Sequence, residues 1–311
     1  MNHIELLGYG YAKPGNTIKF KDQTRHRINK AEENQITLAV DVAKQALNRA
    51  NLKIDDIDLI VSASAVDVQP IPATSVLIHE QIAKGTSIPA MDINTTCTSF
   101  ISALDTISYL VEAGRYERVL IVSSDVASFG LNPKEKESYE LFSDGAAAVI
   151  IARSHDPNKG IIASIQQTFS EGAHDTEIRG GLTGFHPSKF SEETKDEYMF
   201  NMRGRKILKL TMQKMPAVYE QFISSNNLSV DDIDVFVPHQ ASSALRWMIK
   251  LLNIPIEKSI DRVADLGNMV SASVPYAFCE ALDTGVIQPG QRVMLLGTAA
   301  GLTVNLLVWQ L

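Results

Sequence analysis

The sequence predicts a layered α/β fold built from two pseudo-symmetric halves. Three observations lead to this prediction: a helix-end, turn and strand pattern occurs twice, short β-rich runs alternate with helical patterns, and several of those runs are wholly apolar. Apolar runs such as residues 119–122 and 146–151 are typical of strands covered by helices on both faces. We therefore expect sheets buried between layers of helices.

The repeat places the two halves in register. Segment 51–61 recurs as 227–237, an offset of 176 residues (227 − 51), and segment 118–122 recurs as 292–296, an offset of 174 residues (292 − 118). Nearly equal offsets predict two copies of one fold.

Helical patterns precede the repeated strands in both halves. Apolar residues recur at helical spacing from Leu38 to Leu47 and from Leu208 to Tyr219. Turn formers at 154–158 separate the copies, which predicts an N-terminal half at 1–159 and a C-terminal half at 160–311 that share a continuous core.

One segment does not follow the repeat. Residues 170–201 are rich in glycine, charge and aromatic side chains. We expect a long excursion there, of the kind that often covers a site.

Composition excludes several classes of protein. A formal net charge of −7 over 311 residues argues against a general nucleic-acid binder. No apolar window is long enough to span a bilayer and no targeting pattern is visible, so we expect a cytoplasmic protein without membrane association. With only Cys97 and Cys279 there is no disulfide framework, and each cysteine is judged as a thiol.

Cys97 is the first candidate for chemistry. A strand-like start at 91–93 is followed by small polar residues and then by a helical pattern, which predicts the thiol at a helix N-terminus. Unpaired backbone N–H groups and the helix dipole favour thiolate there and could hold an oxyanion. The alternative is a small buried apolar side chain, which is our interpretation of Cys279 beside Phe278.

His239 follows a predicted buried strand, and we expect a helix to begin at Ala241 or Ser242. Ligands bind beyond the carboxyl ends of strands in open α/β sheets. The counterpart of His239 at the 176-residue offset is Ala63 (239 − 176), so only the second half carries a titratable group there. A satisfied structural histidine is the alternative.

Asn268 also lies just before a predicted helix. That helix contains residues 281–284, which match 103–106 of the Cys97 helix at an offset of 178 (281 − 103). We therefore expect Asn268 and Cys97 to begin equivalent helices that meet at the centre. A turn or N-cap role is the alternative for an asparagine after glycine.

Five motifs, in this order along the chain, resemble those of the thiolase-fold condensing enzymes, and specifically the β-ketoacyl-ACP synthase III branch. They are the segment around Cys97, the turn at 142–145, the Pro-His-Gln-Ala string at 238–241, the Gly-Asn string at 267–275 and the terminal turn at 299–303. The Cys-His-Asn set points to the type III branch over the elongating synthases. The resemblance implies a thiolase-like αβαβα fold and a homodimer.

The resemblance also implies a reaction with no permanently bound cofactor and no metal. Cys97 takes an acyl group from an acyl-CoA, and the backbone N–H groups of Cys97 and Ala300 stabilise the oxyanion. His239 and Asn268 then hold a malonyl thioester, carried by acyl carrier protein, while it loses carbon dioxide and attacks the acyl group. The product is a β-ketoacyl thioester, as in the initiation of fatty-acid synthesis.

Less specific correspondences with the family assign residues to an acyl pocket and to the mouth of the site. They place Ile71 and Phe142 in the acyl pocket, with Ile71 reaching into a partner's pocket, and Lys21, Ser242, Arg246 and Lys250 at the mouth for CoA or the carrier. The chain departs from the family pattern here, since segment 17–22 lacks the usual Trp and the terminal turn has Ala299-Ala300 where the family has glycines. We expect a differently shaped acyl pocket that admits longer or branched groups.

Three other functions stay open on the sequence. One is a specialised acyltransferase or condensing enzyme of secondary metabolism with a non-standard starter or acceptor. The others are a cysteine hydrolase, which also uses Cys, His and Asn, and a noncatalytic binding paralogue.

Overall fold

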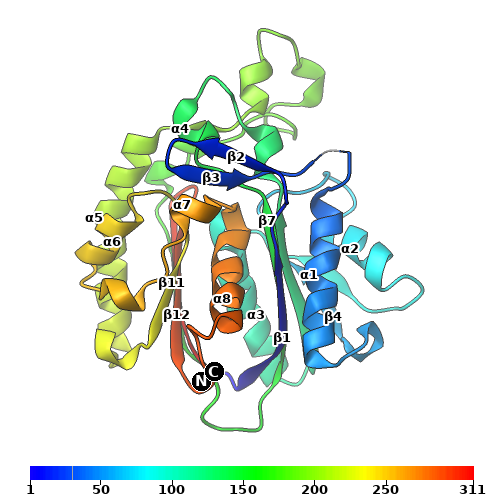
Figure 1. Ribbon diagram of the computed structural model, residues 1–311, viewed down its shortest axis with the longest axis vertical. Helices are drawn as coiled ribbons and strands as arrows, with labels where there is room; N and C mark the ends of the chain where they lie inside the picture. The colour runs from blue at the N-terminus through cyan, green and yellow to red at the C-terminus, as the bar shows by residue number, and fades with distance from the viewer. Residues whose placement is uncertain (30) are drawn as a thin grey trace.

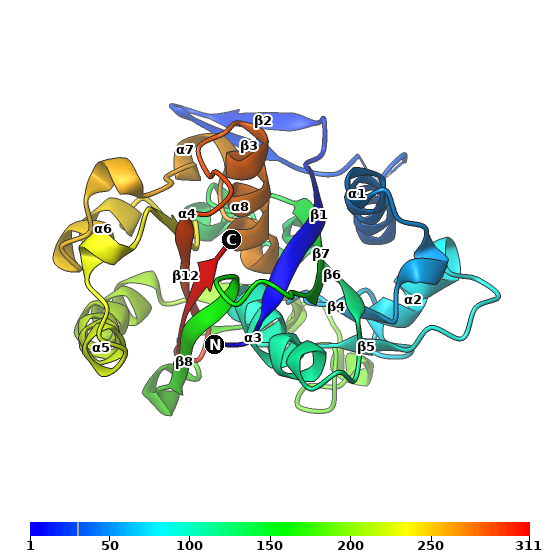
Figure 2. The same ribbon diagram turned by 90° about the horizontal axis from the view of Figure 1, so that it is seen from below.

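The computed structural model describes residues 1–29 and 31–311, and its layers follow the order α, β, α, β, α (Figure 1). Helices α5 and α6 cover one outer face, α1 and α2 cover the other, and α3 and α8 lie between the two sheets in both views (Figures 1 and 2). The predicted αβαβα architecture is confirmed.

The first sheet has the strand order β1-β7-β6-β4-β5. Its strands are β1 (Ile4–Ala12), β4 (Leu59–Ser62), β5 (Ala90–Asp92), β6 (Arg118–Asp125) and β7 (Gly145–Arg153). The second sheet has the order β11-β12-β13-β8. Its strands are β8 (Gly160–Thr168), β11 (Val235–Pro238), β12 (Arg292–Ala299) and β13 (Thr303–Gln310).

Pairing directions repeat between the sheets. β4 and β6 are parallel, as are β11 and β12, while β7 and β13 run antiparallel to both of their neighbours. The chain passes from the first sheet to the second between Arg153 and Gly160. The division into 1–159 and 160–311 stays a prediction, because one apolar cluster contains residues of both halves.

The helices of the fold are short to medium in length. They are α1 (Gln35–Ala50), α2 (Thr74–Ile82), α3 (Ser99–Glu112), α4 (Lys136–Tyr139), α5 (Gly204–Ser225), α6 (Leu245–Leu251), α7 (Val263–Leu266) and α8 (Ser273–Asp283). Among the residues described, no helix is long and apolar enough to cross a bilayer.

The repeated helix ends explain part of the symmetry. Asn51 closes α1 in a left-handed conformation with φ 53°, and Asn227 adopts φ 50° just after α5. Asparagine tolerates this conformation better than most residues, so each asparagine directs the chain out of its helix toward the next strand.

The central layer carries the shared core. Phe100 and Leu104 of α3 and Phe278 of α8 are fully buried, and Phe278 stacks on Trp309 of β13 with ring centroids 5.6 Å apart. Cys279 is fully buried among these side chains, which confirms its interpretation as core.

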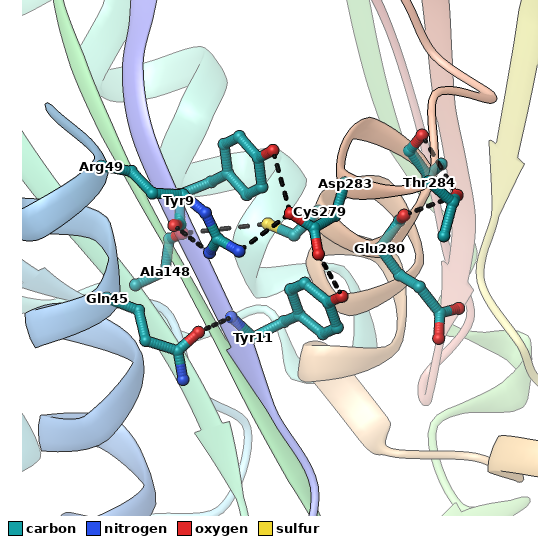
Figure 3. A network of polar contacts seen from close by, with 10 residues as sticks. Tyr9, Tyr11, Gln45, Arg49, Ala148, Cys279, Glu280, Asp283 and Thr284 are labelled. Carbon is teal, nitrogen blue, oxygen red and sulfur yellow. Dashed lines mark hydrogen bonds and ion pairs between the residues drawn. The ribbon is translucent and has the colours of Figure 1, made fainter.

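A polar network joins α1 and β1 to α8 at the edge of this core (Figure 3). Arg49 donates to Asp283 over 2.9 Å and lies above the ring of Tyr9, and the Tyr11 hydroxyl donates to the other carboxylate oxygen over 2.9 Å. The network therefore links the two halves directly.

Two short antiparallel strand pairs complete the fold. One is formed by β2 (Thr17–Phe20) and β3 (Gln23–His26), and the other by β9 (Thr176–Glu177) and β10 (Asn201–Met202). Between β9 and β10 the chain makes only short 3-10 turns and protrudes from the body, as expected for the 170–201 excursion (Figure 1).

Candidate active site

One cavity brings the three candidate residues together. It has a volume of about 1060 Å³, and Cys97, His239 and Asn268 all line it. Most of its other lining residues are apolar and come from both halves, including Leu131, Phe142, Phe200, Ile207, Leu208, Met215, Met248 and Val270. A cavity of this kind suits a flexible, mostly apolar ligand.

Cys97 lies in the 3-10 turn η2 (Thr96–Thr98), directly before α3. Thr96 has φ 54°, a left-handed conformation that is unusual for a β-branched residue. The Asn94 side chain accepts a hydrogen bond from the Thr96 N–H over 2.9 Å. This sharp elbow presents the sulfur to the cavity.

The resting state of Cys97 differs from the prediction. Burial raises the pKa of the Cys97 thiol to about 12, and the nearby charge of Asp125 acts in the same direction. The backbone N–H groups of Ala300 and Cys97 oppose this shift only in part. The expected thiolate is therefore wrong for the free protein, because burial outweighs the N–H groups at the helix start.

His239 follows β11, and its backbone N–H donates to Leu296 O over 2.8 Å. Burial lowers the pKa of the imidazole to about 4, so the ring is neutral at physiological pH. Its Nδ1 is buried without a hydrogen-bond partner among the described residues. Gly297 lies against the base of this side chain, since a Cβ there would come within 3.2 Å of His239 Cβ.

The helix after His239 begins later than expected. The Ala241 N–H donates to His239 O over 2.8 Å, and α6 starts only at Leu245. The prediction of a helix from Ala241 or Ser242 was wrong, because a tight turn intervenes. That turn leaves Ser242 on the cavity wall.

Asn268 is held through both its backbone and its side chain. Its N–H donates to Leu141 O over 3.0 Å and its C=O accepts from the Ser143 N–H over 2.9 Å. Its Oδ1 accepts from the Val270 N–H over 2.8 Å, while Nδ2 donates to Ala241 O over 3.3 Å. With Oδ1 occupied, the second Nδ2 hydrogen is the group left for a ligand.

The symmetry of the centre is set by an offset of 174 residues. α3 starts at Ser99 and α8 at Ser273 (273 − 99), so the counterpart of Cys97 is Ser271 and the counterpart of Asn268 is Asn94. Both asparagines accept from the N–H two residues later.

Cys97 and Asn268 therefore precede equivalent helices, α3 and α8, as expected, but they are not counterparts of one another. The 178-residue offset was wrong as a register, because the two helices align at 174.

Asp125 is a buried central residue that the sequence reasoning missed. Its Oδ1 accepts from the N–H groups of Ala65 and Val66 over 2.9 and 2.8 Å, and its Oδ2 accepts from the Ser271 N–H over 2.9 Å and from the Ser271 hydroxyl. Burial raises the pKa of this carboxyl group. An aspartate at the end of a strand with an apolar centre was the available signal.

The predicted pocket and mouth residues separate into two groups. Phe142, Ala300 and Ser242 line the cavity, and the ring of Phe142 lies 4.9 Å from that of Phe200. Ile71 does not line it and is 84% exposed, so its predicted reach into a partner's pocket stays a prediction.

The three basic residues assigned to the mouth lie outside the cavity wall. Lys21 is at the tip of the β2-β3 hairpin, Arg246 is ion-paired with Asp261 over 2.6 Å, and Lys250 is exposed at the end of α6. An aromatic residue at the mouth is instead Trp247, which lines the cavity and is 67% exposed. The sequence reasoning did not identify it.

Family models match two segments of the chain. Residues 91–169 match the model of 3-oxoacyl-[acyl-carrier-protein] synthase III, and residues 223–311 match the model of its C-terminal part. These segments contain Cys97, His239 and Asn268.

Curated relatives match over nearly the whole chain. The β-ketoacyl-[acyl-carrier-protein] synthase III of Clostridium perfringens is 30% identical over 97% of this chain and 98% of its own length. The protein of the same name from Porphyra purpurea is 33% identical over 88% and 84%.

Solved structures share the fold. The 3-oxoacyl-[acyl-carrier-protein] synthase III of Aquifex aeolicus superposes with a TM-score of 0.88 at 24% identity, covering 99% of this chain and all of that one. The priming β-ketosynthase of the R1128 polyketide pathway superposes with a TM-score of 0.88 at 21% identity, covering 99% and 96%. The chain belongs to the β-ketoacyl-[acyl-carrier-protein] synthase III family of acyltransferases.

Proposed function

We propose that this protein condenses an acyl group with a malonyl thioester, and that Cys97, His239 and Asn268 carry the reaction. One observation supports the proposal above all: these three side chains line one largely apolar cavity. The reaction is that of fatty-acid initiation, as the names of the relatives indicate.

The first step transfers the acyl group. The Cys97 sulfur bonds to the acyl carbon of an acyl thioester, the carbon–sulfur bond to the donor breaks, and the cysteine proton leaves with the donor thiol. Negative charge on the acyl oxygen is stabilised by the N–H groups of Cys97 and Ala300. Acyl-CoA is the donor we propose for this step.

The second step forms the carbon–carbon bond. A malonyl thioester, borne by acyl carrier protein, loses carbon dioxide, and enolate charge develops on its thioester oxygen. Neutral His239 and the Asn268 amide are the polar side chains available to stabilise that oxygen. The carbanion attacks acyl-Cys97, the cysteine sulfur leaves, and it regains a proton from water.

Intact mass tests the first step. Wild-type protein incubated with acyl-CoAs of rising chain length should gain a single acyl group, and Cys97→Ser should gain none. An adduct that persists in Cys97→Ser would overturn the assignment of the nucleophile. Rapid release of free acid without an adduct would favour a hydrolase.

We also propose a homodimer in which Ile71 reaches the partner's acyl pocket. Ile71, Val68 and Val76 are all exposed on one segment of the chain, which supports a covered surface there. Light scattering should give twice the chain mass, and Ile71→Asp should lower it. The cytoplasmic location stays a prediction that cell fractionation would test.

A further inference from the structure

Arg25 is a charged side chain that is wholly buried and bonded only to carbonyl oxygens. It lies on β3, and its exposed fraction is 0%. Its Nε donates to Glu140 O over 2.7 Å, and its Nη1 donates to Thr24 O over 2.6 Å. Nη1 also donates to Val263 O and Ala264 O over 3.2 and 3.1 Å, and Nη2 donates to the Gln23 side-chain oxygen.

A buried guanidinium is costly unless its N–H groups are satisfied. Here the planar fork of donors reaches three separate segments at once, which a lysine ammonium at the end of a flexible stem does not reproduce. None of the acceptors is a carboxylate. The arrangement therefore holds backbone in place, which is a positioning role.

The clamped segments are those that hold Asn268. Glu140 directly precedes Leu141, whose carbonyl accepts from the Asn268 N–H. Val263 and Ala264 belong to α7, which leads into Gly267 and Asn268.

Gly267 itself rests on the arginine. A Cβ at Gly267 would come within 2.5 Å of Arg25 Cδ, and Gly267 has φ 68°, so a side chain is excluded by contact and by conformation. The arginine thus fixes the backbone immediately before Asn268.

Cys97 is supported by other groups. Its elbow is held by Asn94 and by the Ser99 hydroxyl, which accepts from the Thr95 N–H over 3.0 Å. Arg25 neither bonds to this elbow nor lines the cavity. The two halves of the reaction therefore have separate supports.

We propose that Arg25 is the positioning residue for Asn268, and that it serves the decarboxylation of the malonyl thioester but not the acylation of Cys97. This inference rests on the proposed function, since it assigns Asn268 to the malonyl step.

The test separates the two half-reactions. Acylation is followed by intact mass with an acyl-CoA, and decarboxylation by carbon dioxide release from malonyl-ACP. In Arg25→Lys we expect decarboxylation to fall by roughly 100-fold, because small misplacements of a catalytic group have effects of that size. Acylation should change by no more than about twofold.

A double-mutant cycle shows whether Arg25 acts through Asn268. In an Asn268→Ala background, Arg25→Lys should lower decarboxylation by no more than about twofold, because its target is already gone. If Arg25 had only a general structural role, the losses of decarboxylation caused by the two substitutions would multiply. Leu47→Ala, a core change in α1, is the matched control and should leave the ratio of the two rates unchanged.

The outcomes are distinct. If wild type performs neither half-reaction, the proposed function fails and the inference with it. If wild type performs both and Arg25→Lys lowers both equally, only the inference fails. Should Arg25→Lys not fold, Gln23→Ala frees one end of the fork, and a smaller but equally selective loss of decarboxylation is expected.

Discussion

At the scale of single residues, the chemistry of Cys97 depends on burial. The pKa of the free thiol is raised to about 12, and the pKa of His239 is lowered to about 4, so both groups are neutral at rest. A preformed thiolate–imidazolium pair, as in cysteine proteases, is not expected. The cysteine must lose its proton during acyl transfer.

Alkylation of Cys97 by iodoacetamide should therefore rise about tenfold per pH unit from about pH 6 to about pH 10, because the thiolate fraction grows in that proportion below the pKa. The rate is measured as loss of free thiol by mass. Cys97→Ser serves as the control, since the remaining Cys279 is fully buried and should stay unmodified. A rate that levels off below about pH 8 would contradict the raised pKa.

The Asn268 amide has two ends with different tasks. Asn268→Asp keeps an oxygen for the Val270 N–H but replaces the Nδ2 donor with a second acceptor. Decarboxylation of malonyl-ACP should fall by about 10²–10³-fold, as for loss of one donor to a developing oxyanion. Acylation of Cys97, followed by mass, should persist. Equal loss of both activities would argue against the assigned role.

At the scale of elements, the elbow before α3 combines strain with function. Thr96 has φ 54°, and its hydroxyl is buried without a hydrogen-bond partner among the described residues. Such a conformation costs on the order of 1–3 kcal/mol in a non-glycine residue. Glycine would avoid this cost, but its greater conformational freedom in the unfolded state would offset part of the gain.

Thr96→Gly should therefore stabilise the protein by about 1 kcal/mol. The same change should slow acylation by roughly tenfold, because the sulfur is held less firmly. Urea unfolding and the rate of adduct formation measure the two effects. The finding that glycine lowers stability would show that the elbow is unstrained.

Much of the architecture was visible in the sequence because the repeat leaves a local signature. The Asn51 and Asn227 helix ends and the paired strands that follow were predicted from one duplicated segment. The correct alignment of α3 with α8 was not predicted, because the two 3-10 turns before these helices share geometry but little sequence. Thr96 and Val270 occupy equivalent left-handed positions without being similar residues.

The candidate site was likewise predictable only in part from the sequence. Cys97, His239 and Asn268 were selected from their places beside strand and helix ends, and the fold places them on one cavity. The charge state of Cys97 was not predictable, because it depends on how many atoms of other segments bury it. Asp125 and Arg25 were missed for a similar reason, since their importance lies in contacts with residues far away in the chain.

At the scale of the whole molecule, two carboxylates join the halves in different environments. Asp125 is fully buried and accepts hydrogen bonds from the loop after β4, at Ala65, and from the turn before α8, at Ser271. Asp283 binds Arg49 and Tyr11 at a partly exposed position (Figure 3). Loss of a buried carboxylate that is fully hydrogen-bonded costs far more than loss of an exposed ion pair.

Asp125→Asn should therefore lower the free energy of unfolding by about 3 kcal/mol. The new amide NH₂ would face a backbone N–H group from which the carboxylate had accepted a hydrogen bond. Asp283→Asn is the matched control and should cost less than about 1 kcal/mol. Urea unfolding measures both.

The same Asp125→Asn variant should be alkylated faster at Cys97 near pH 8, since the Asp125 charge helps to raise the pKa of that thiol. If its alkylation rate matches that of wild type, the carboxyl group at position 125 is neutral in the folded protein and does not raise the pKa of the Cys97 thiol.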